Sequence, residues 1–257
     1  MTETYVYEDE LNDDFADNFT QPLRIIDENY KYNTRNPLWH IISFVLYYLL
    51  AVPFGFLYIK IAFGLKIKGR KNLRKLKGGY CLYLNHTNWI DSFIPSFIAW
   101  PKRAYIITSP RAVSLPLLPI LVPMLGGVPL NSSSLGKKHF REFLNKKMSN
   151  SNVVAVFPEA HLWPFYNKIR NFNEHSFTYP VRQKTPVVIS TLTYHQRRVF
   201  KNAKPTVTIT IGRPILPDTW EKSDNPKMFL RNKVLKIMKD TVRQENSYAF
   251  NKYIKKS

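Results

Sequence analysis

The chain has 257 residues, 44% of them hydrophobic, and a formal net charge of +20. This length suffices for one large domain with a substantial core. The single cysteine, Cys81, excludes an intrachain disulfide and a multi-cysteine metal site. Because Cys81 lies in the apolar run 80–84, we expect a buried, inert thiol rather than a nucleophile.

The charge is divided unevenly along the chain. Residues 1–30 hold nine acidic side chains and one base, Arg24, whereas residues 31–257 hold 37 bases and nine acids, a balance of +28. So basic a body attracts anionic surfaces such as nucleic acid, acidic lipid headgroups or acidic carriers. Since no helix-turn-helix, zinc-finger or RRM-type signature occurs, we expect an anionic phospholipid membrane as partner and no nucleic acid.

Residues 1–36 are predicted to be an acidic leader. They lack a basic stretch followed by an apolar run, so they are not a secretory signal. Their composition predicts a flexible segment, or a strap that lies on the basic body.

Residues 37–66 are predicted to be a membrane-associated helical segment. Positions 38–59 carry no formal charge with His40 neutral, and a helix of this length would extend about 33 Å, enough for a hydrocarbon core of about 30 Å. Pro53 and Gly55 interrupt the run. Three alternatives remain: one kinked span, two short helices that enter one leaflet and return, or a buried helix of a soluble core.

The residues after position 59 are strongly basic, which favours the membrane interpretations. By the positive-inside tendency, they place the following domain on the cytoplasmic side. These residues are Lys60, Lys66, Lys68, Arg70, Lys71, Arg74, Lys75 and Lys77.

Residues 67–257 alternate between strand and helix patterns. Buried or alternating apolar runs predict strands, and apolar spacing at three and four residues predicts helices. The predicted strands are 80–84, 104–107, 153–157, 186–190 and 206–211, and the predicted helices are 92–100, 137–148 and a basic C-terminal helix over 227–242. This order predicts an α/β domain with a central mixed sheet flanked by helices.

The strongest candidate for chemistry is the segment Asn85-His86-Thr87-Asn88-Trp89-Ile90-Asp91, which follows the predicted strand 80–84. Open α/β sheets place their sites at the carboxyl ends of strands. There His86 could take a proton from an alcohol, while Asp91 fixes the imidazole tautomer and stabilises its cation. No separate nucleophile is then required. The alternative is a structural histidine.

Two further segments could contribute to a site. Phe157-Pro158-Glu159 closes the predicted strand 153–157, which places a carboxylate at the same edge of the sheet; the alternative is a solvated turn. In the segment 126–131, the glycines Gly126 and Gly127 let the backbone approach a ligand, although a plain turn before a strand would use the same residues.

In this order, the three segments resemble those of the lysophosphatidic acid acyltransferase family, the PlsC-like glycerolipid acyltransferases. His86 and Asp91 match its His-four-residues-Asp motif, residues 126–131 its second motif, and Phe157-Pro158-Glu159 the start of its third. Residues 185–189 resemble the fourth motif and 209–215 the closing strand and turn, so the resemblance covers about residues 65–220. It implies an O-acyltransferase in which His86, held by Asp91, deprotonates the acceptor hydroxyl.

The resemblance fails where the family binds the acceptor's phosphate. The second motif's arginine falls at Ser132, and the Gly-Thr-Arg of the third falls at Ala160-His161-Leu162. Because charge-assisted hydrogen bonds to phosphate are strong, we expect substitutes. Arg170 is the preferred one, and His161, Lys168 and His175 are also near in sequence.

The expected function is therefore transfer of a fatty acyl group from acyl-CoA or acyl-acyl carrier protein to a lysophospholipid, most simply 1-acylglycerol 3-phosphate. A phosphate-free acceptor, a thioesterase side activity and a catalytically silent membrane protein remain alternatives. No cofactor or metal is expected. Trp163 and Phe165 are expected in core packing rather than in an acyl channel. The expected substrate-binding residues are Asn85, Asn88, Gly126, Gly127, Asn131, Phe157, Pro158, Glu159, His161 and Arg170.

Overall fold

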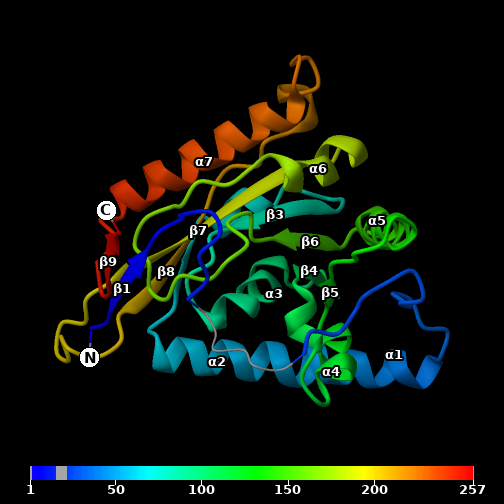
Figure 1. The fold of residues 1–257 in the computed structure, drawn as a ribbon, viewed down its shortest axis with the longest axis horizontal. Coiled ribbons are helices and arrows are strands. Elements are labelled where there is room, and N and C mark those ends of the chain that lie inside the picture. The colour runs from blue at the N-terminus through cyan, green and yellow to red at the C-terminus, as the bar shows by residue number, and fades with distance from the viewer. Residues whose placement is uncertain (1, 16–21, 257) are drawn as a thin grey trace.

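The computed structural model describes residues 2–15 and 22–256. A seven-stranded sheet forms its centre (Figure 1). In spatial order the strands are β2 (Lys66–Lys68), β8 (Thr206–Ile211), β7 (Val187–His195), β3 (Tyr80–Leu84), β6 (Val153–Val156), β4 (Ala104–Thr108) and β5 (Gly127–Pro129).

The sheet is mixed, as predicted. Strands β7, β3, β6, β4 and β5 run parallel, whereas β8 is antiparallel to β7 and β2 is parallel to β8. The carboxyl ends of the five parallel strands therefore meet at one edge of the sheet, the position at which open α/β folds bind their ligands.

Helices cover both faces of the sheet, with α5, α6 and α7 on one side and α1 to α4 on the other (Figure 1). The central strand β3 is fully buried. Its side chains Cys81 and Tyr83 pack in the core on the α5–α7 side of the sheet, and Tyr80, Leu82 and Leu84 pack in the core on the side of the long helix. The helices are α1 (Pro37–Phe44), α2 (Val52–Ala62), α3 (Ile94–Ala99), α4 (Leu118–Met124), α5 (Ser134–Ser149), α6 (Thr178–Gln183) and α7 (Pro226–Gln244). Short 3-10 turns are Arg70–Leu73, Trp89–Ser92, Pro110–Val113, His175–Phe177 and Pro217–Thr219.

Every strand and helix predicted from the pattern of residues 67–257 is present within a few residues. The largest difference is β7, which extends to His195 rather than ending near residue 190. Its extra residues pair with β8 in a long antiparallel ladder, and all of them except His195 are buried. The short elements β2, α4, β5 and α6 were not predicted, because three to seven residues hold too little periodicity.

The apolar segment forms one continuous helix from Pro37 to Ala62, which excludes the alternative of two separate helices. Asn36 caps its start by accepting a hydrogen bond from the Leu38 amide at 3.0 Å. A π-helical stretch, Val45–Ala51, joins α1 to α2, and the Val52 amide bonds to the Tyr47 carbonyl five residues back. The wide turn falls directly before Pro53, whose missing N–H would interrupt an α-helix.

One face of this helix is fixed to the domain. Tyr47 Oη accepts a hydrogen bond from the Ala104 amide at 2.9 Å, and Ser43 Oγ donates to the Met124 carbonyl at 2.8 Å. Near the other end, Val52 and Ile59 are buried in the same core as α3.

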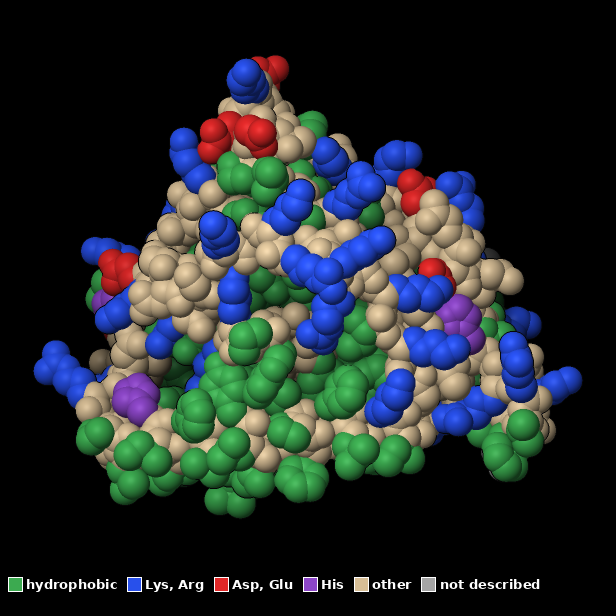
Figure 2. Space-filling view, turned by 180° about the vertical axis from the view of Figure 1, so that it is seen from behind, with side chains coloured by type: hydrophobic (Ala, Val, Ile, Leu, Met, Phe, Trp, Pro, Cys, Tyr) green, Lys and Arg blue, Asp and Glu red, His purple; other side chains and the backbone are tan. Residues whose placement is uncertain are grey.

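The opposite face of the helix is exposed and apolar. Only 17% of its most apolar window is buried, so a buried core helix is also excluded. Figure 2 shows a continuous band of hydrophobic side chains along this edge, with Lys and Arg side chains above it and at its ends. The helix is the one element in the described residues that is long and apolar enough to cross a membrane. We call this band the apolar platform; its helical members are Leu38, Ile41, Ile42, Phe44, Val45, Leu49, Leu50, Phe54, Phe56, Leu57, Tyr58 and Ile61.

The described part of the acidic leader, residues 2–15 and 22–36, contacts the body of the domain. Strand β1 (Thr4–Tyr7) pairs in parallel with the C-terminal strand β9 (Lys252–Lys255). Further along, the Trp163 indole N–H donates to the Asp13 carbonyl at 2.7 Å, and Ser132 contacts the backbone of Ile26. The leader therefore crosses the edge of the sheet where the candidate motifs lie.

Candidate active site

A cleft of about 850 Å³ opens at the carboxyl edge of the parallel strands. His86 reaches it from the end of β3, Phe157 and Pro158 from the end of β6, and Thr108 from the end of β4. Tyr47 and Val52 of the long helix form another part of its wall. Apolar surface predominates in the lining, so the cleft suits a hydrocarbon chain near a few polar groups.

His86 and Asp91 form a hydrogen-bonded pair at this cleft. The His86 Nδ1 atom lies 3.3 Å from Asp91 Oδ2, and the imidazole is 19% exposed. Because the carboxylate engages Nδ1, the other ring nitrogen is left to exchange a proton with a ligand. The ring of Phe157 stacks on the imidazole with centroids 4.5 Å apart and limits its rotation.

Asp91 is held by backbone groups at the start of the 3-10 turn Trp89–Ser92. Its Oδ2 atom accepts hydrogen bonds from the amides of Thr87 at 2.6 Å and Asn88 at 2.8 Å. A carboxylate at the N-terminus of such a turn satisfies amides that have no partner within the turn. The four residues between His86 and Asp91 thus fold back so that the two side chains meet.

The imidazole of His86 has no hydroxyl or thiol partner among the described residues, where its side-chain hydrogen bond goes to Asp91. Cys81 is fully buried, and burial raises the pKa of its thiol to about 12. The arrangement therefore offers a candidate base and an orienting carboxylate, with no protein nucleophile beside them in the described residues. This favours direct attack by a bound alcohol or water.

Glu159 lies behind the cleft rather than in it. Its carboxylate is buried and accepts hydrogen bonds from the amides of His86 at 3.3 Å and Arg170 at 3.1 Å. Burial raises the pKa of Glu159, while the guanidinium of Arg170, 3.4 Å away, opposes this shift. The expected solvated or substrate-facing glutamate is instead an internal brace for the His86 loop.

Arg170 is enclosed as well, which contradicts its expected role as the substitute phosphate ligand. Its side chain is 0% exposed and pairs with Glu159, and it also donates to the carbonyls of His161 and Glu10. The guanidinium lies 4.9 Å from the centre of the Trp163 ring. A guanidinium so occupied has no access to a ligand in the cleft.

Asn85 and Asn88 also have internal roles and do not line the cleft. The Asn85 side chain exchanges two hydrogen bonds with the backbone of Leu192, at 2.8 and 3.0 Å, and so joins the end of β3 to β7. Asn88 caps the following 3-10 turn through the amide of Ile90. Both were expected to bind substrate, but both are buried and support the loop that holds His86.

The glycine segment divides between the cleft and the leader. Gly127 lines the cleft, whereas Gly126 adopts φ +94° at a point where a Cβ atom would lie 2.4 Å from the Ala104 carbonyl oxygen. Asn131, expected to bind substrate, donates instead to the carbonyl of Asp27 in the leader at 2.7 Å.

Two aromatic residues pack in the core as expected. Trp163 is fully buried and stacks on Tyr253 with centroids 5.1 Å apart, and Phe165 packs against Tyr194 and Phe250. Neither lines the cleft.

Two charged residues at the cleft were not identified from the sequence. Arg111 comes from the 3-10 turn Pro110–Val113 that follows β4, and Asp14 comes from the leader. His161, which was predicted, lies with them. Arg111 could have been found by the reasoning used for His86, since it follows a strand whose end meets the same edge. Asp14 had no local signal, because only the tertiary path of the leader brings it here.

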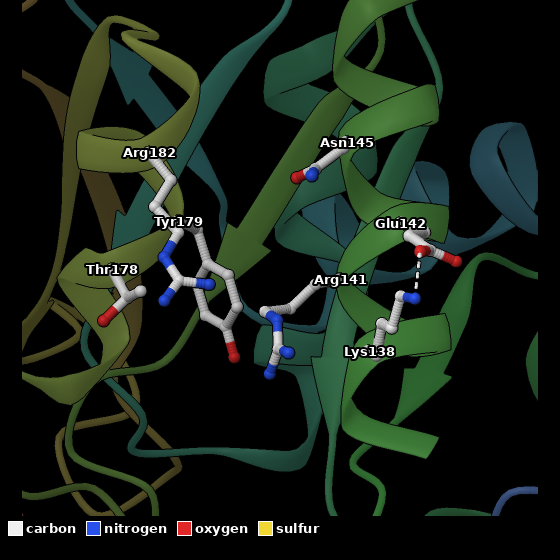
Figure 3. Close-up of a pocket in the computed structure, with 7 residues that line it drawn as sticks. All are labelled: Lys138, Arg141, Glu142, Asn145, Thr178, Tyr179 and Arg182. Atoms are coloured by element: carbon white, nitrogen blue, oxygen red, sulfur yellow. Dashed lines mark ion pairs between the residues drawn. The ribbon is translucent and has the colours of Figure 1, made fainter. Parts of the chain in front are cut away.

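A second, smaller hollow of about 110 Å³ lies between α5 and α6 (Figure 3). Arg141 and Arg182 face it from the two helices, and neither forms an ion pair with a described residue; Lys138 and Glu142 pair with each other at 4.0 Å. Tyr179 lines both this hollow and the cleft, so the two adjoin. Within residues 2–15 and 22–256, no group of His, Cys, Asp and Glu side chains is arranged to hold a metal ion.

The family model described as Acyltransferase matches residues 64–217, more than half of the chain and the whole of the cleft's sheet edge. The chain belongs to this acyltransferase family. No curated protein matches the sequence.

The acyltransferase fold is also seen in a solved relative. The crystal structure of PlsC, a 1-acyl-sn-glycerophosphate (LPA) acyltransferase from Thermotoga maritima, superposes with a TM-score of 0.57 at 18% sequence identity. The match covers 82% of this chain and 88% of that one, so both share the mixed sheet and its flanking helices. At this identity the likeness establishes the fold.

The enclosed Glu159–Arg170 pair generates a test of stability. Replacing Arg170 by Met leaves a buried carboxylate without its partner, which should lower the free energy of unfolding by about 3–5 kcal/mol. Adding Glu159→Gln to Arg170→Met should restore part of the loss, because the orphaned charge is then gone. Urea unfolding in detergent measures both. If Arg170→Met kept wild-type stability and only weakened substrate binding, Arg170 would be a ligand after all.

Proposed function

We propose that this acyltransferase moves a fatty acyl group from a thioester donor to the hydroxyl of a lysophospholipid, with His86 as general base and Asp91 as its orienting partner. The supporting observation is the His86–Asp91 pair at the mouth of a large apolar cleft, without a protein nucleophile among the described residues. Such a pair activates a bound alcohol directly, and the cleft offers room for an acyl chain.

The reaction would proceed in two proton-transfer steps. The free ring nitrogen of His86 takes the proton of the acceptor hydroxyl as its oxygen attacks the thioester carbonyl carbon. The tetrahedral intermediate then collapses, the carbon–sulfur bond breaks, and the imidazolium returns the proton to the departing thiolate. Asp91 stabilises the imidazolium between these steps and does not itself take up the proton.

The proposed acceptor is 1-acylglycerol 3-phosphate, which would give phosphatidic acid. The solved relative is an acyltransferase of 1-acyl-sn-glycerophosphate, and the cleft of this chain combines apolar lining with Arg111 and His161. An acceptor without phosphate is the second candidate. It is supported by the Ser132 and Ala160-His161-Leu162 positions, where the expected arginines are missing.

His86→Ala should lower kcat for acyl transfer by about 10²–10⁴-fold, the usual contribution of a positioned base. Asp91→Asn should also lower kcat, since the tautomer is no longer fixed. The assay uses full-length protein in detergent, acyl-CoA and acyl-acyl carrier protein as donors, and 1-acylglycerol 3-phosphate and uncharged 1-acylglycerol as acceptors. His139→Ala, on α5 and outside the cleft, serves as the matched histidine control.

The products separate the alternatives. Phosphatidic acid formed by the wild type and not by His86→Ala supports the proposal. Faster release of free fatty acid than of ester would indicate a thioesterase. Transfer to 1-acylglycerol alone would change the acceptor, and wild-type rates in His86→Ala would remove the catalytic assignment.

The hollow between α5 and α6 is the proposed site for the anionic part of the donor. Arg141 and Arg182 provide two guanidinium groups without ion-pair partners among the described residues (Figure 3). Tyr179, whose pKa burial raises to about 12, adds a hydroxyl group that can donate to an anion. Both candidate donors are anionic, and the shared Tyr179 leads from this hollow to the cleft.

The double variant Arg141→Gln, Arg182→Gln should raise KM for the donor by about tenfold or more, because each guanidinium can form charge-assisted hydrogen bonds. The KM for the acceptor should stay within about twofold, since the acceptor binds elsewhere. Lys137→Gln with Lys146→Gln removes the same charge from exposed positions of α5 and is the control. An equal rise in donor KM in both double variants would mean that only net charge matters.

The apolar platform is the proposed membrane contact, with the long helix lying in the plane of the interface. The helix packs lengthwise on the domain through Ser43, Tyr47, Val52 and Ile59, and Tyr47 and Val52 also line the cleft, so the cleft lies beside the helix that would contact the bilayer. A helix with one apolar face and basic neighbours binds an anionic membrane surface in this way. The domain would then stand on the cytoplasmic side.

Leu49→Gln with Leu57→Gln should weaken binding to vesicles that contain anionic phospholipid by about a hundredfold or more, because each buried leucine contributes about 1.5–3 kcal/mol. Co-sedimentation measures binding, and circular dichroism checks that the helix persists. Leu216→Gln with Met228→Gln, two exposed apolar residues on the α7 side, is the control. Unchanged sedimentation of the helix variant would exclude this face as the contact.

A further inference from the structure

The leader places a carboxylate inside the cleft. Asp14 Oδ2 lies 3.2 Å from a guanidinium nitrogen of Arg111 and 3.4 Å from His161 Nδ1. All three residues line the same cleft as His86. The carboxylate therefore bridges two nitrogen donors that come from different loops, one after β4 and one after β6.

The backbone of the leader holds Asp14 at this position. On one side of it, the Asp13 carbonyl accepts the Trp163 indole N–H at 2.7 Å; on the other, the Phe15 amide donates to the Leu162 carbonyl at 3.2 Å. Asp14 lies between these two anchors, so its side chain is directed at the loop that carries His161. The contact is thus part of a docked segment and not an isolated surface ion pair.

The two donors suit a larger anion than the one they hold. Arg111 remains 43% exposed and His161 36% exposed, so solvent and ligands reach both. A guanidinium presents the same fork of N–H groups to a carboxylate and to a phosphate. A phosphate monoester carries up to two negative charges and three acceptor oxygens, whereas Asp14 carries one charge.

We propose that Arg111 and His161 form the binding site for the phosphate monoester headgroup of the acceptor, and that Asp14 occupies this site until the acceptor displaces it. This inference rests on the proposed function for the identity of the acceptor. Arg111 supplies the specificity for an anionic headgroup, and the leader acts as an intramolecular competitor. Only the Asp14 side chain must turn away, because β1 and β9 anchor the leader independently.

The test measures headgroup binding in the absence of turnover. Isothermal titration of the full-length protein in detergent uses glycerol 3-phosphate as the probe and glycerol as its uncharged counterpart. The variants are Arg111→Gln and Asp14→Asn. The matched controls are Arg213→Gln and Glu28→Gln, which remove the same charges from exposed positions of the body and the leader.

Arg111→Gln should weaken glycerol 3-phosphate binding by about tenfold or more, since it removes a charge-assisted contact. Asp14→Asn should tighten binding by about three- to tenfold, because the competing charge is gone while the anchors remain. The controls should stay within about twofold of wild type, and glycerol should show no dependence on either variant. If Asp14→Asn left binding unchanged or weakened it, the competitor role would be overturned.

Steady-state kinetics then separate this inference from the proposed function. With 1-acylglycerol 3-phosphate as acceptor, Arg111→Gln should raise KM and Asp14→Asn should lower it, and neither should change KM for 1-acylglycerol. Binding that follows these variants without any acyl transfer would uphold the anion site and overturn the proposed function. Acyl transfer whose KM ignores both variants would uphold the function and overturn the site.

Discussion

The buried carboxylate of Glu159 is the contact on which the rest of the site depends. It binds the amide of His86 at the end of β3 and both the amide and the guanidinium of Arg170, so it fixes two loops from one position. Arg170 in turn reaches the carbonyls of His161 and Glu10, which connects the brace to the loop after β6 and to the leader. A buried charge tolerates little displacement from its partners. Because Glu159 binds the His86 amide, it also restricts movement of the loop that carries His86.

The sequence patterns predicted which loops meet at the cleft better than they predicted the contacts of the polar residues around it. The predicted positions of His86, Phe157 and His161 after strand ends placed them at one cleft, because the carboxyl ends of parallel strands meet at one edge of the sheet. Asn85, Asn88, Glu159 and Arg170 were expected to touch substrate, yet they hold the loops from behind. A polar residue beside a motif has the same sequence signal whether it binds substrate or supports a loop. Only the packed structure decides whether its hydrogen-bond partner is a ligand or the backbone.

The leader meets both loops at which the family resemblance predicts arginines. Ser132, at the second-motif position, binds the Ile26 carbonyl through its amide and its hydroxyl, at 3.0 and 3.1 Å. Leu162, where the third motif's arginine falls, accepts a hydrogen bond from the Phe15 amide at 3.2 Å, and the neighbouring His161 faces Asp14. Arginines at these positions would meet the leader instead of solvent, so loss of the arginines and docking of the leader are physically compatible changes. The net charges of the two segments, −8 for residues 1–30 and +28 for residues 31–257, do not indicate where the segments touch.

The parallel pairing of β1 with β9 joins the first described residues to the last ones. During synthesis β1 is made long before its strand partner, residues 252–255. The central sheet, whose last strand ends at Ile211, can therefore assemble around the cleft while β1 still has no partner. Synthesis of β9 would be the event that secures the leader, so a truncated product lacking β9 would retain the cleft but lose the strand that holds the leader beside it.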